Sequence, residues 1–220
     1  MPLEGQIVEI VLLSLKVSLS AVVLSALVGI PLGALLAVGR FRGQSVLIVL
    51  VNASMGLPPV VVGLGLYLLF SRSGPLGVLQ LLYTPAAMII AQTILVTPII
   101  ASFSQQVFSD LHHEYDEMLR AMKASRWQTM ATLIHDARHS LITALLAGLG
   151  RALSEIGAVM IVGGNIAHAT RVMTTAIALE TSKGNLYLAV TLGLILLALS
   201  GVINVVMILL RSRLERLAHV

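Results

Sequence analysis

Two charged side chains, Arg151 and Glu155, stand one helical turn apart inside an otherwise apolar stretch that covers residues 141–162. A lone charge at the centre of a membrane helix costs about 2.5–3.5 kcal/mol on insertion scales, so both side chains must face protein or water. At this spacing they can pair with each other. They form either a structural ion pair that anchors helix packing or a site where Arg151 stands beside the path of an anion, and the residues leave both interpretations open.

The other chemically capable residues do not assemble into a catalytic or metal site. The chain has no cysteine, which excludes disulfides, thiolate ligands and a cysteine nucleophile. His135 and His139 are four residues apart, and His112 and His113 are adjacent, but none of them lies in a His-Glu-x-x-His pattern. No P-loop pattern occurs, so any ATP hydrolysis belongs to a partner. We therefore expect a chain that is not an enzyme and uses no cofactor or metal.

The composition is that of a membrane protein. Of 220 residues, 57% are hydrophobic and only 11% are charged, which is too apolar for a soluble globule of this length. With one Trp and four Tyr, the chain has no basic face with interleaved aromatics, so nucleic acid is not an expected partner. We expect a multi-pass protein of the bacterial or archaeal cytoplasmic (inner) membrane, surrounded by lipid.

The chain contains five apolar stretches that meet or exceed the length of about 20 residues needed to cross a bilayer. They cover residues 7–38, 46–70, 85–107, 141–162 and 186–210. We therefore predict an all-α membrane protein with about five transmembrane helices and a single transmembrane domain over residues 1–220.

A Gly-Leu-Pro-Pro run at residues 56–59 lies near the middle of the second span. Two adjacent prolines remove two backbone donors, so this helix should be bent or broken inside the membrane. Backbone groups freed at membrane depth must meet protein or water. Candidate pathway residues are therefore Asn52, Ser54, Gly56, Pro58 and Pro59, with a simple packing kink as the alternative.

Small residues recur at intervals of four on two spans, where a second helix can approach closely. These stripes are Gly29, Gly33 and Ala37 on the first span, and Ala144, Gly148 and Ala152 on the fourth.

The basic residues predict the orientation, because Lys and Arg accumulate in short cytoplasmic loops. With the N-terminus outside, the inner side holds nine of the fourteen basic residues, the outer side holds three, and two lie within spans. The inner nine are Arg40, Arg42, Arg120, Lys123, Arg126, Arg138, Arg211, Arg213 and Arg216. This orientation places the C-terminus inside and makes residues 108–140 a cytoplasmic loop.

That loop has local helix signals of its own. Residues 114–122 favour helix by composition, and the run from Ser125 to Gln128 fits a capping box. Two short helices that meet near Lys123 and Ala124 follow from these signals. A solvated loop without function is the alternative.

Three runs resemble the permease subunits of bacterial ABC importers, most closely the molybdate and tungstate group. They are Ala-Ser-Arg-Trp-Gln-Thr at 124–129, Gly-Arg-Ala-Leu-Ser-Glu-Ile-Gly-Ala at 150–158, and the stretch 170–184. Permeases of this superfamily carry a loop with Glu-Ala-Ala, three residues, Gly, nine residues, an apolar residue, one residue and Leu-Pro. Glu117 matches the acidic position, whereas Met118 and Leu119 replace the alanines, Lys123 replaces the glycine, and His135-Asp136 replaces Leu-Pro.

The resemblance implies a type I ABC importer permease fold and a short coupling helix that sits in a groove of an ATPase. The coupling residues that it implies are Glu117, Met118, Ala121, Lys123, Ala124, Ser125 and Trp127. It also implies a homodimer, a cytoplasmic ATPase subunit, an extracytoplasmic binding protein, and import of tungstate or a related oxyanion. Lys123 in place of glycine implies either a left-handed residue or a different turn.

Other classes of membrane protein stay open. A permease of the same superfamily could carry another small solute. A secondary transporter would need several membrane-buried carboxylates, and Glu155 is the only deep one. A channel or a membrane scaffold would leave the loop at 108–140 without a purpose.

Overall fold

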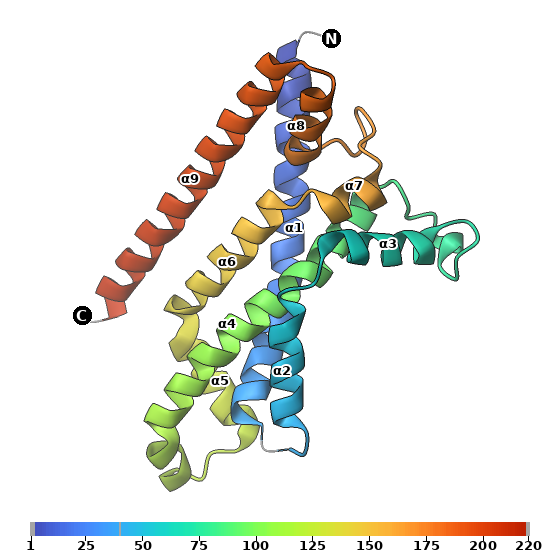
Figure 1. Cartoon of the computed structure of the whole chain (residues 1–220). Coiled ribbons are helices and arrows are strands. Elements are labelled where there is room, and N and C mark those ends of the chain that lie inside the picture. The colour runs from blue at the N-terminus through green and yellow to red at the C-terminus, as the bar shows by residue number, and fades with distance from the viewer. Residues whose placement is uncertain (1–2, 40, 219–220) are drawn as a thin grey trace.

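The computed structural model describes residues 3–39 and 41–218. Over these residues the chain folds into nine α-helices and two short 3-10 helices without a β-strand (Figure 1), as the all-α prediction requires. The elements are α1 (Leu3–Val38), α2 (Gln44–Ser54), α3 (Pro59–Phe70), η1 (Gly77–Leu79), α4 (Pro85–Ala121), α5 (Arg126–Asp136), η2 (Ala137–His139), α6 (Leu141–Ser154), α7 (Gly157–Gly163), α8 (Met173–Ser182) and α9 (Leu186–Ala218).

Three helices, α1, α4 and α9, are long and apolar enough to cross a membrane by themselves. Two bent pairs, α2 with α3 and α6 with α7, reach the same criterion only when each pair is taken together. The number of spans is therefore three, or up to five if each bent pair is one span. The predicted orientation stays a prediction: Arg40 lies outside the described residues, and so do the side chains of Arg120, Arg126, Arg211, Arg213 and Arg216.

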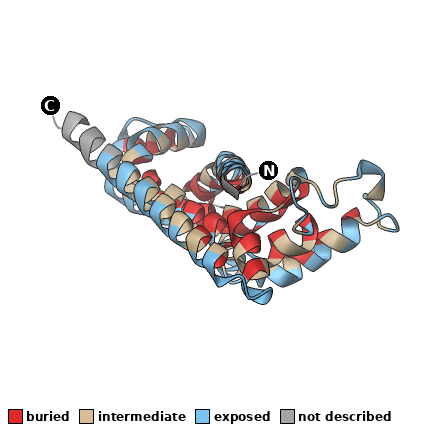
Figure 2. Cartoon of the chain, turned by 90° about the horizontal axis from the view of Figure 1, so that it is seen from above, coloured by how far each residue is buried: buried red, intermediate tan, exposed pale blue. Residues whose placement is uncertain are grey.

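The core forms where α1 packs along α4, and small residues on α1 allow the close approach. A Cβ added at Gly33 would lie 2.7 Å from the carbonyl oxygen of Ala101, and one at Gly29 would lie 3.1 Å from the amide nitrogen of Ala101. The stripe on α6 works in the same way, since a Cβ at Gly148 would lie 2.9 Å from Ile100 Cδ1. Both predicted stripes are confirmed as packing faces. Figure 2 shows the buried residues gathered at the middle of the helix cluster, while α9 is exposed along much of its length.

The expected break in the second span is present. Helix α2 ends at Ser54, α3 begins at Pro59, and their axes differ by 98°. Pro58 adopts an extended conformation directly before α3, and Pro59 occupies the first turn, where the missing N–H needs no partner. As a result, α3 turns away from α2 and projects from the side of the molecule (Figure 1).

Two expected elements differ from the structure. The fourth span is not one continuous helix, because α6 ends at Ser154 and α7 begins at Gly157 at an angle of 56°. The helical segment at 114–122 is not a separate short helix, because α4 runs without interruption for 37 residues to Ala121. Strong helix formers in residues 114–121 continue the helix, and no proline or glycine in residues 108–121 stops it.

Candidate transport pathway and coupling tip

Arg151 and Glu155 pair with each other, at the break between α6 and α7. Arg151 Nη2 lies 3.6 Å from Glu155 Oε2, and the Glu155 side chain is 3% exposed while that of Arg151 is 31% exposed. Glu155 Oε1 accepts a hydrogen bond from the Ala158 N–H at 3.0 Å. The carboxylate therefore satisfies an amide in the first turn of α7 while it faces the guanidinium, and this explains why the helix can break here.

The end of α6 receives further polar partners that the sequence analysis missed. Gln92 Nε2 donates to the Ala152 carbonyl at 3.0 Å, and Ser18 Oγ donates to the same oxygen at 3.4 Å. The last carbonyls of a helix have no intrahelical partner, so these side chains replace the bonds that the break removes. Thr174 Oγ1 donates to the Glu155 carbonyl at 2.9 Å. Gln92 could have been found, because it is an amide in the middle of an apolar span.

The two broken helices meet at their breaks. A Cβ on Gly157 would lie 2.9 Å from Val60 Cγ2, and one on Gly63 would lie 2.8 Å from the Cα of Ala158. Helices α3 and α7 are thus packed backbone to backbone, directly after the residues where each chain segment bends. This contact joins the two half-helices.

The predicted pathway residues of the second span divide into two groups. Asn52 is exposed, and its Oδ1 accepts a hydrogen bond from Ser102 Oγ of α4 at 2.5 Å. Ser54 instead bonds to the Leu50 carbonyl of its own helix at 2.7 Å. The break residues Gly56 and Pro58 are exposed, and Pro59 is half-buried.

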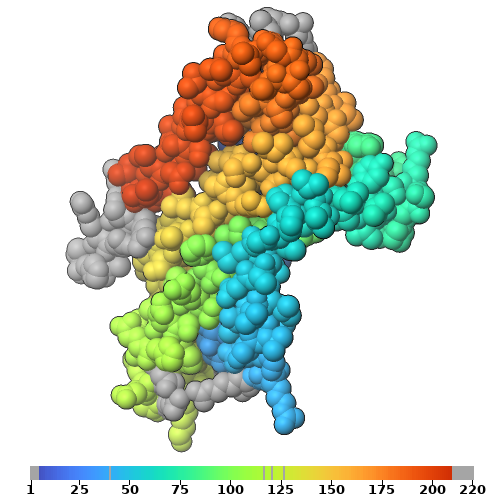
Figure 3. Space-filling view, viewed as in Figure 1, coloured from blue at the N-terminus to red at the C-terminus, as the bar shows by residue number. Residues whose placement is uncertain are grey.

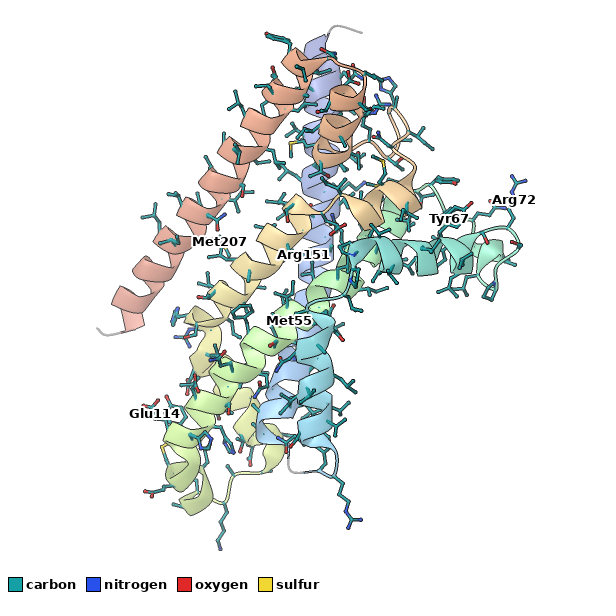
Figure 4. All side chains as sticks on the ribbon, viewed as in Figure 1. Met55, Tyr67, Arg72, Glu114, Arg151 and Met207 are labelled. Carbon is teal, nitrogen blue, oxygen red and sulfur yellow. The ribbon has the colours of Figure 1, made fainter. Side chains whose placement is uncertain are left out.

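One face of the molecule collects these polar groups. Figure 4 shows Arg151 and Met55 on the same face, where α6, α4 and α2 lie side by side. Ser154, one turn after Arg151 on α6, is exposed, and the Asn52–Ser102 pair joins α2 to α4. We name these four residues the polar face. The Nε atom of Arg151 is buried and finds no hydrogen-bond partner among the described residues.

The turn between α4 and α5 has well-defined geometry. Lys123 adopts the left-handed conformation with φ of 51°. Of the two predicted alternatives, a left-handed residue or a different turn, the structure has the left-handed residue. The Ala124 N–H donates to the Leu119 carbonyl at 3.0 Å, which is the hydrogen bond of a Schellman motif. Ser125 then caps α5: the Gln128 N–H donates to its hydroxyl at 3.3 Å, and the Ser125 N–H donates to Gln128 Oε1 at 2.8 Å. The predicted capping box is confirmed.

Large apolar side chains are exposed around this turn. Met118 is 50% exposed, Met122 72% and Trp127 78%. Glu117, Ala121, Lys123 and Ser125 are also exposed, whereas Ala124 is half-buried. We name residues 117–127 the coupling tip, after the coupling role that the sequence resemblance predicts for them. It lies at the end of the molecule away from the N-terminus (Figure 1).

A second charged cluster lies where α8 turns into α9. Glu180 Oε1 accepts from Lys183 Nζ at 2.8 Å, and Glu180 Oε2 accepts from Asn185 Nδ2 at 3.0 Å. The hydrogen bond from the Lys183 ammonium lowers the pKa of the Glu180 carboxyl, against a smaller opposing effect of burial. Within the described residues, no group of three or more His, Asp or Glu side chains could hold a metal ion.

The chain as a whole is similar to a known kind of membrane protein. Residues 29–218 match the protein family described as the binding-protein-dependent transport system inner membrane component. The chain belongs to this family, whose members are the permease subunits of ABC transporters, proteins of the inner membrane. In general, such permeases work with an ATPase and a binding protein.

Individual relatives cover most of the chain. A protein of Haloferax volcanii described as a probable anion ABC transporter permease is 43% identical over 198 residues, covering 88% of this chain and 85% of the relative. The tungstate uptake system permease of Peptoclostridium acidaminophilum is 39% identical and covers 92% of this chain and 89% of the relative. The molybdenum transport system permease of Azotobacter vinelandii is 29% identical over 80% of this chain and 82% of the relative.

Proposed function

We propose that this chain forms the membrane pathway of an importer for tungstate or a closely related tetrahedral oxyanion. Two copies would enclose the pathway, an ATPase subunit would bind each coupling tip, and a binding protein would deliver the oxyanion from outside. The observation that carries the choice of substrate is the similarity to tungstate permeases at 39% and 35% identity over most of the chain.

Arg151 supplies the chemistry that suits an anion. Its guanidinium is part-exposed on the polar face, and Glu155 holds it from one side only, at 3.6 Å. A guanidinium offers several donors in a fixed fork that matches the oxygen atoms of tetrahedral anions. The partial neutralisation by Glu155 keeps the attraction weak enough for the anion to leave, as transport requires.

The polar face is one wall of the pathway. Polar and charged side chains at membrane depth must meet water or protein, and Asn52, Ser102 and Arg151 are not covered within one copy. A second copy that presents the same face would enclose a polar path between two Arg151 side chains and would leave the apolar flanks to lipid.

Helix α4 gives a direct route from the coupling tip to the pathway. It ends in the tip at Ala121 and carries Gln92, whose amide donates to Ala152 just before the α6–α7 break. Closure of two ATPase subunits would pull the tips together and move α4. The hydrogen bond from Gln92 and the packed α3–α7 pair would pass that movement to the outer half of the pathway.

The test is co-purification together with uptake. The chain is purified in mild detergent from its native membrane as wild type, Glu117→Arg, Trp127→Ala and, as a control, Tyr187→Ala, which changes an 85% exposed side chain at the start of α9, far from the tip. We expect an ATPase subunit to elute with the wild type and with the control and to be lost from both tip variants, because each removes an exposed contact of the tip.

Uptake is measured in membrane vesicles that contain the binding protein. We expect ATP-dependent accumulation of tungstate in wild type and control, and none in the tip variants. A wild-type chain that transports without an ATPase would refute the importer assignment. ATP-dependent uptake of another solute, with no uptake of tungstate, molybdate or sulfate, would refute only the oxyanion.

A further inference from the structure

A second site of anion-binding character lies on the arm formed by α3 and the segment that follows it, residues 59–84. Beyond its contact with α7, this arm extends away from the helix cluster (Figure 1). The arm borders an open groove of about 960 Å³, far more than the roughly 10–15 Å³ that holds one water molecule. Figure 3 shows a hollow on the upper side of the arm, between its tip and the body of the molecule.

The polar side chains around the groove share one property, which is that all of them can donate hydrogen bonds. They are Tyr67, Ser71, Arg72, Ser73, Gln80 and Tyr83. No carboxylate stands among the residues that the structure places around the groove. One guanidinium with several hydroxyl and amide donors is the set of groups that binds a phosphate-like oxyanion.

Two tyrosine hydroxyl groups interact with each other at the groove. The Tyr67 hydroxyl and burial both raise the pKa of Tyr83, because they stabilise its neutral form. Both tyrosines line the groove, and each hydroxyl group can donate one hydrogen bond. Figure 4 shows Tyr67 and Arg72 on the same side of the arm, the side toward the start of α1, which we predict to be outside.

The inner edge of the groove is bonded to α7. The Tyr83 N–H donates to the Val162 carbonyl of α7 at 2.8 Å, and Tyr83 has a left-handed φ of 63°. A Cβ on Gly164 would lie 2.7 Å from the Tyr83 ring, so the ring packs closely against the end of α7. An anion in the groove would therefore contact the arm, whose helix α3 packs against α7 next to the α6–α7 break.

We infer that the groove of the arm binds a tetrahedral oxyanion, held by Arg72 and the Tyr67 hydroxyl, on the outer side of the membrane. The ion is either the free transported oxyanion or the phosphate of a lipid headgroup, since both offer the same oxygen acceptors. The identity of the free ion rests on the proposed function. The site is distinct from Arg151, which lies on α6 and not on the arm.

The absence of native cysteine allows a site-specific reporter. Leu79→Cys, an exposed position that does not line the groove, is labelled with an environment-sensitive fluorophore on the full chain with its co-purifying subunits, in nanodiscs of phosphatidylcholine. Tungstate and inorganic phosphate are titrated at constant ionic strength, with chloride as the blank. The variants are Arg72→Gln, Arg72→Lys and the control Arg42→Gln, an exposed arginine in the turn before α2.

We expect a saturable signal with tungstate, whose half-saturating concentration rises about tenfold in Arg72→Gln, rises less in Arg72→Lys and stays unchanged in Arg42→Gln. A signal that appears only when phosphatidylglycerol is added to the discs, and that Arg72→Gln removes, also supports the site and identifies the phosphate of an anionic lipid headgroup, which is not neutralised by choline, as its ligand. A signal that does not depend on Arg72, or no signal in either lipid, refutes the site.

The proposed function is tested by a different measurement, which is ATP-dependent uptake. If ATP-dependent tungstate uptake is intact while the groove gives no Arg72-dependent signal, only this inference is wrong. If the groove binds an oxyanion but no oxyanion is transported, the inference holds and the proposed function is wrong.

Discussion

The carboxylate of Glu155 has two partners, and both lose their acceptor when it is removed. It accepts from the Ala158 N–H at 3.0 Å and faces Arg151 at 3.6 Å, in a position where it is almost fully buried. Loss of the carboxylate leaves a buried donor and a guanidinium without their acceptor, and a buried unpaired donor costs about 1–3 kcal/mol.

We therefore predict that Glu155→Ala lowers the free energy of unfolding by about 1–3 kcal/mol. Glu155→Gln should lose less, because its amide oxygen can still accept from Ala158. Thermal unfolding of the detergent-solubilised chain measures both. Equal stability of Glu155→Ala and wild type would show that the break does not depend on this cap.

Lys123 holds a backbone conformation that glycine adopts without steric cost. Its φ of 51° places it in the left-handed region, where a side chain costs about 1–2 kcal/mol. Part of the gain from glycine is lost to the greater entropy of the unfolded chain. Lys123→Gly should thus stabilise the tip by up to about 1 kcal/mol, measured as protection of the Ala124 amide from hydrogen exchange. As a control, Ala121→Gly at the end of α4 should reduce protection.

The Glu180 cluster predicts how stability depends on pH. The folded-state pKa of this carboxyl is lowered by Lys183, below the ordinary value of about 4.3 that the unfolded chain retains. Its contribution to stability is therefore fully present above the ordinary value and is lost as the pH falls through the lowered one. Glu180→Gln should unfold at a lower temperature than wild type at pH 7, and the difference should shrink under acid. A difference that is constant from pH 7 to pH 3 would contradict the assignment.

The helices pack through glycine at positions where no other residue fits. A Cβ at Gly33 would lie 2.8 Å from the Gln105 amide nitrogen and 2.7 Å from the Ala101 carbonyl, both backbone atoms that cannot move alone. A larger residue must therefore push α1 away from α4 along the core of the molecule. Gly193 on α9 has no atom within 4 Å of the corresponding position and offers a matched control.

We expect Gly33→Val to lower stability by about 1–3 kcal/mol, the range found for overpacked cores. Gly193→Val should leave stability within about 0.5 kcal/mol, as for other surface substitutions. Thermal unfolding and the yield of monodisperse protein report both variants. Equal losses in the two variants would mean that the loss at Gly33 does not come from the packing of α1 on α4.

The arrangement of two copies is a property of the whole molecule. If the polar faces of two copies line a common pathway, Ser154 of each copy should lie near the other, since Ser154 is exposed next to Arg151. Because the native chain has no cysteine, Ser154→Cys can be treated in membranes with a bifunctional maleimide without background. We expect a dimer band on a denaturing gel.

Tyr187→Cys, equally accessible but at the start of α9, should give much less dimer. Dimer yields that are equal for both positions would place the interface elsewhere and would remove the polar face from the pathway.

The sequence by itself determined the class of the protein and most of its helices. Apolar length and charge are local properties, so the helices that begin at Pro85, Leu141 and Leu186, the bend at residues 56–59 and the cap at Ser125 follow from residues close together in the chain. The pairing of Arg151 with Glu155 was also accessible, because helical spacing brings the two within reach.

Only the tertiary structure decided where the fourth span breaks and what surrounds the break. The helix can end before Glu155 because Gln92 and Thr174, which lie far away in the sequence, donate to the freed carbonyls. Such contacts leave no local periodicity in the sequence. The same holds for the contact of α3 with α7, which depends on two glycines in different helices. Local energies favour helices one at a time, whereas packing between distant segments selects which of them bend and which side chains meet.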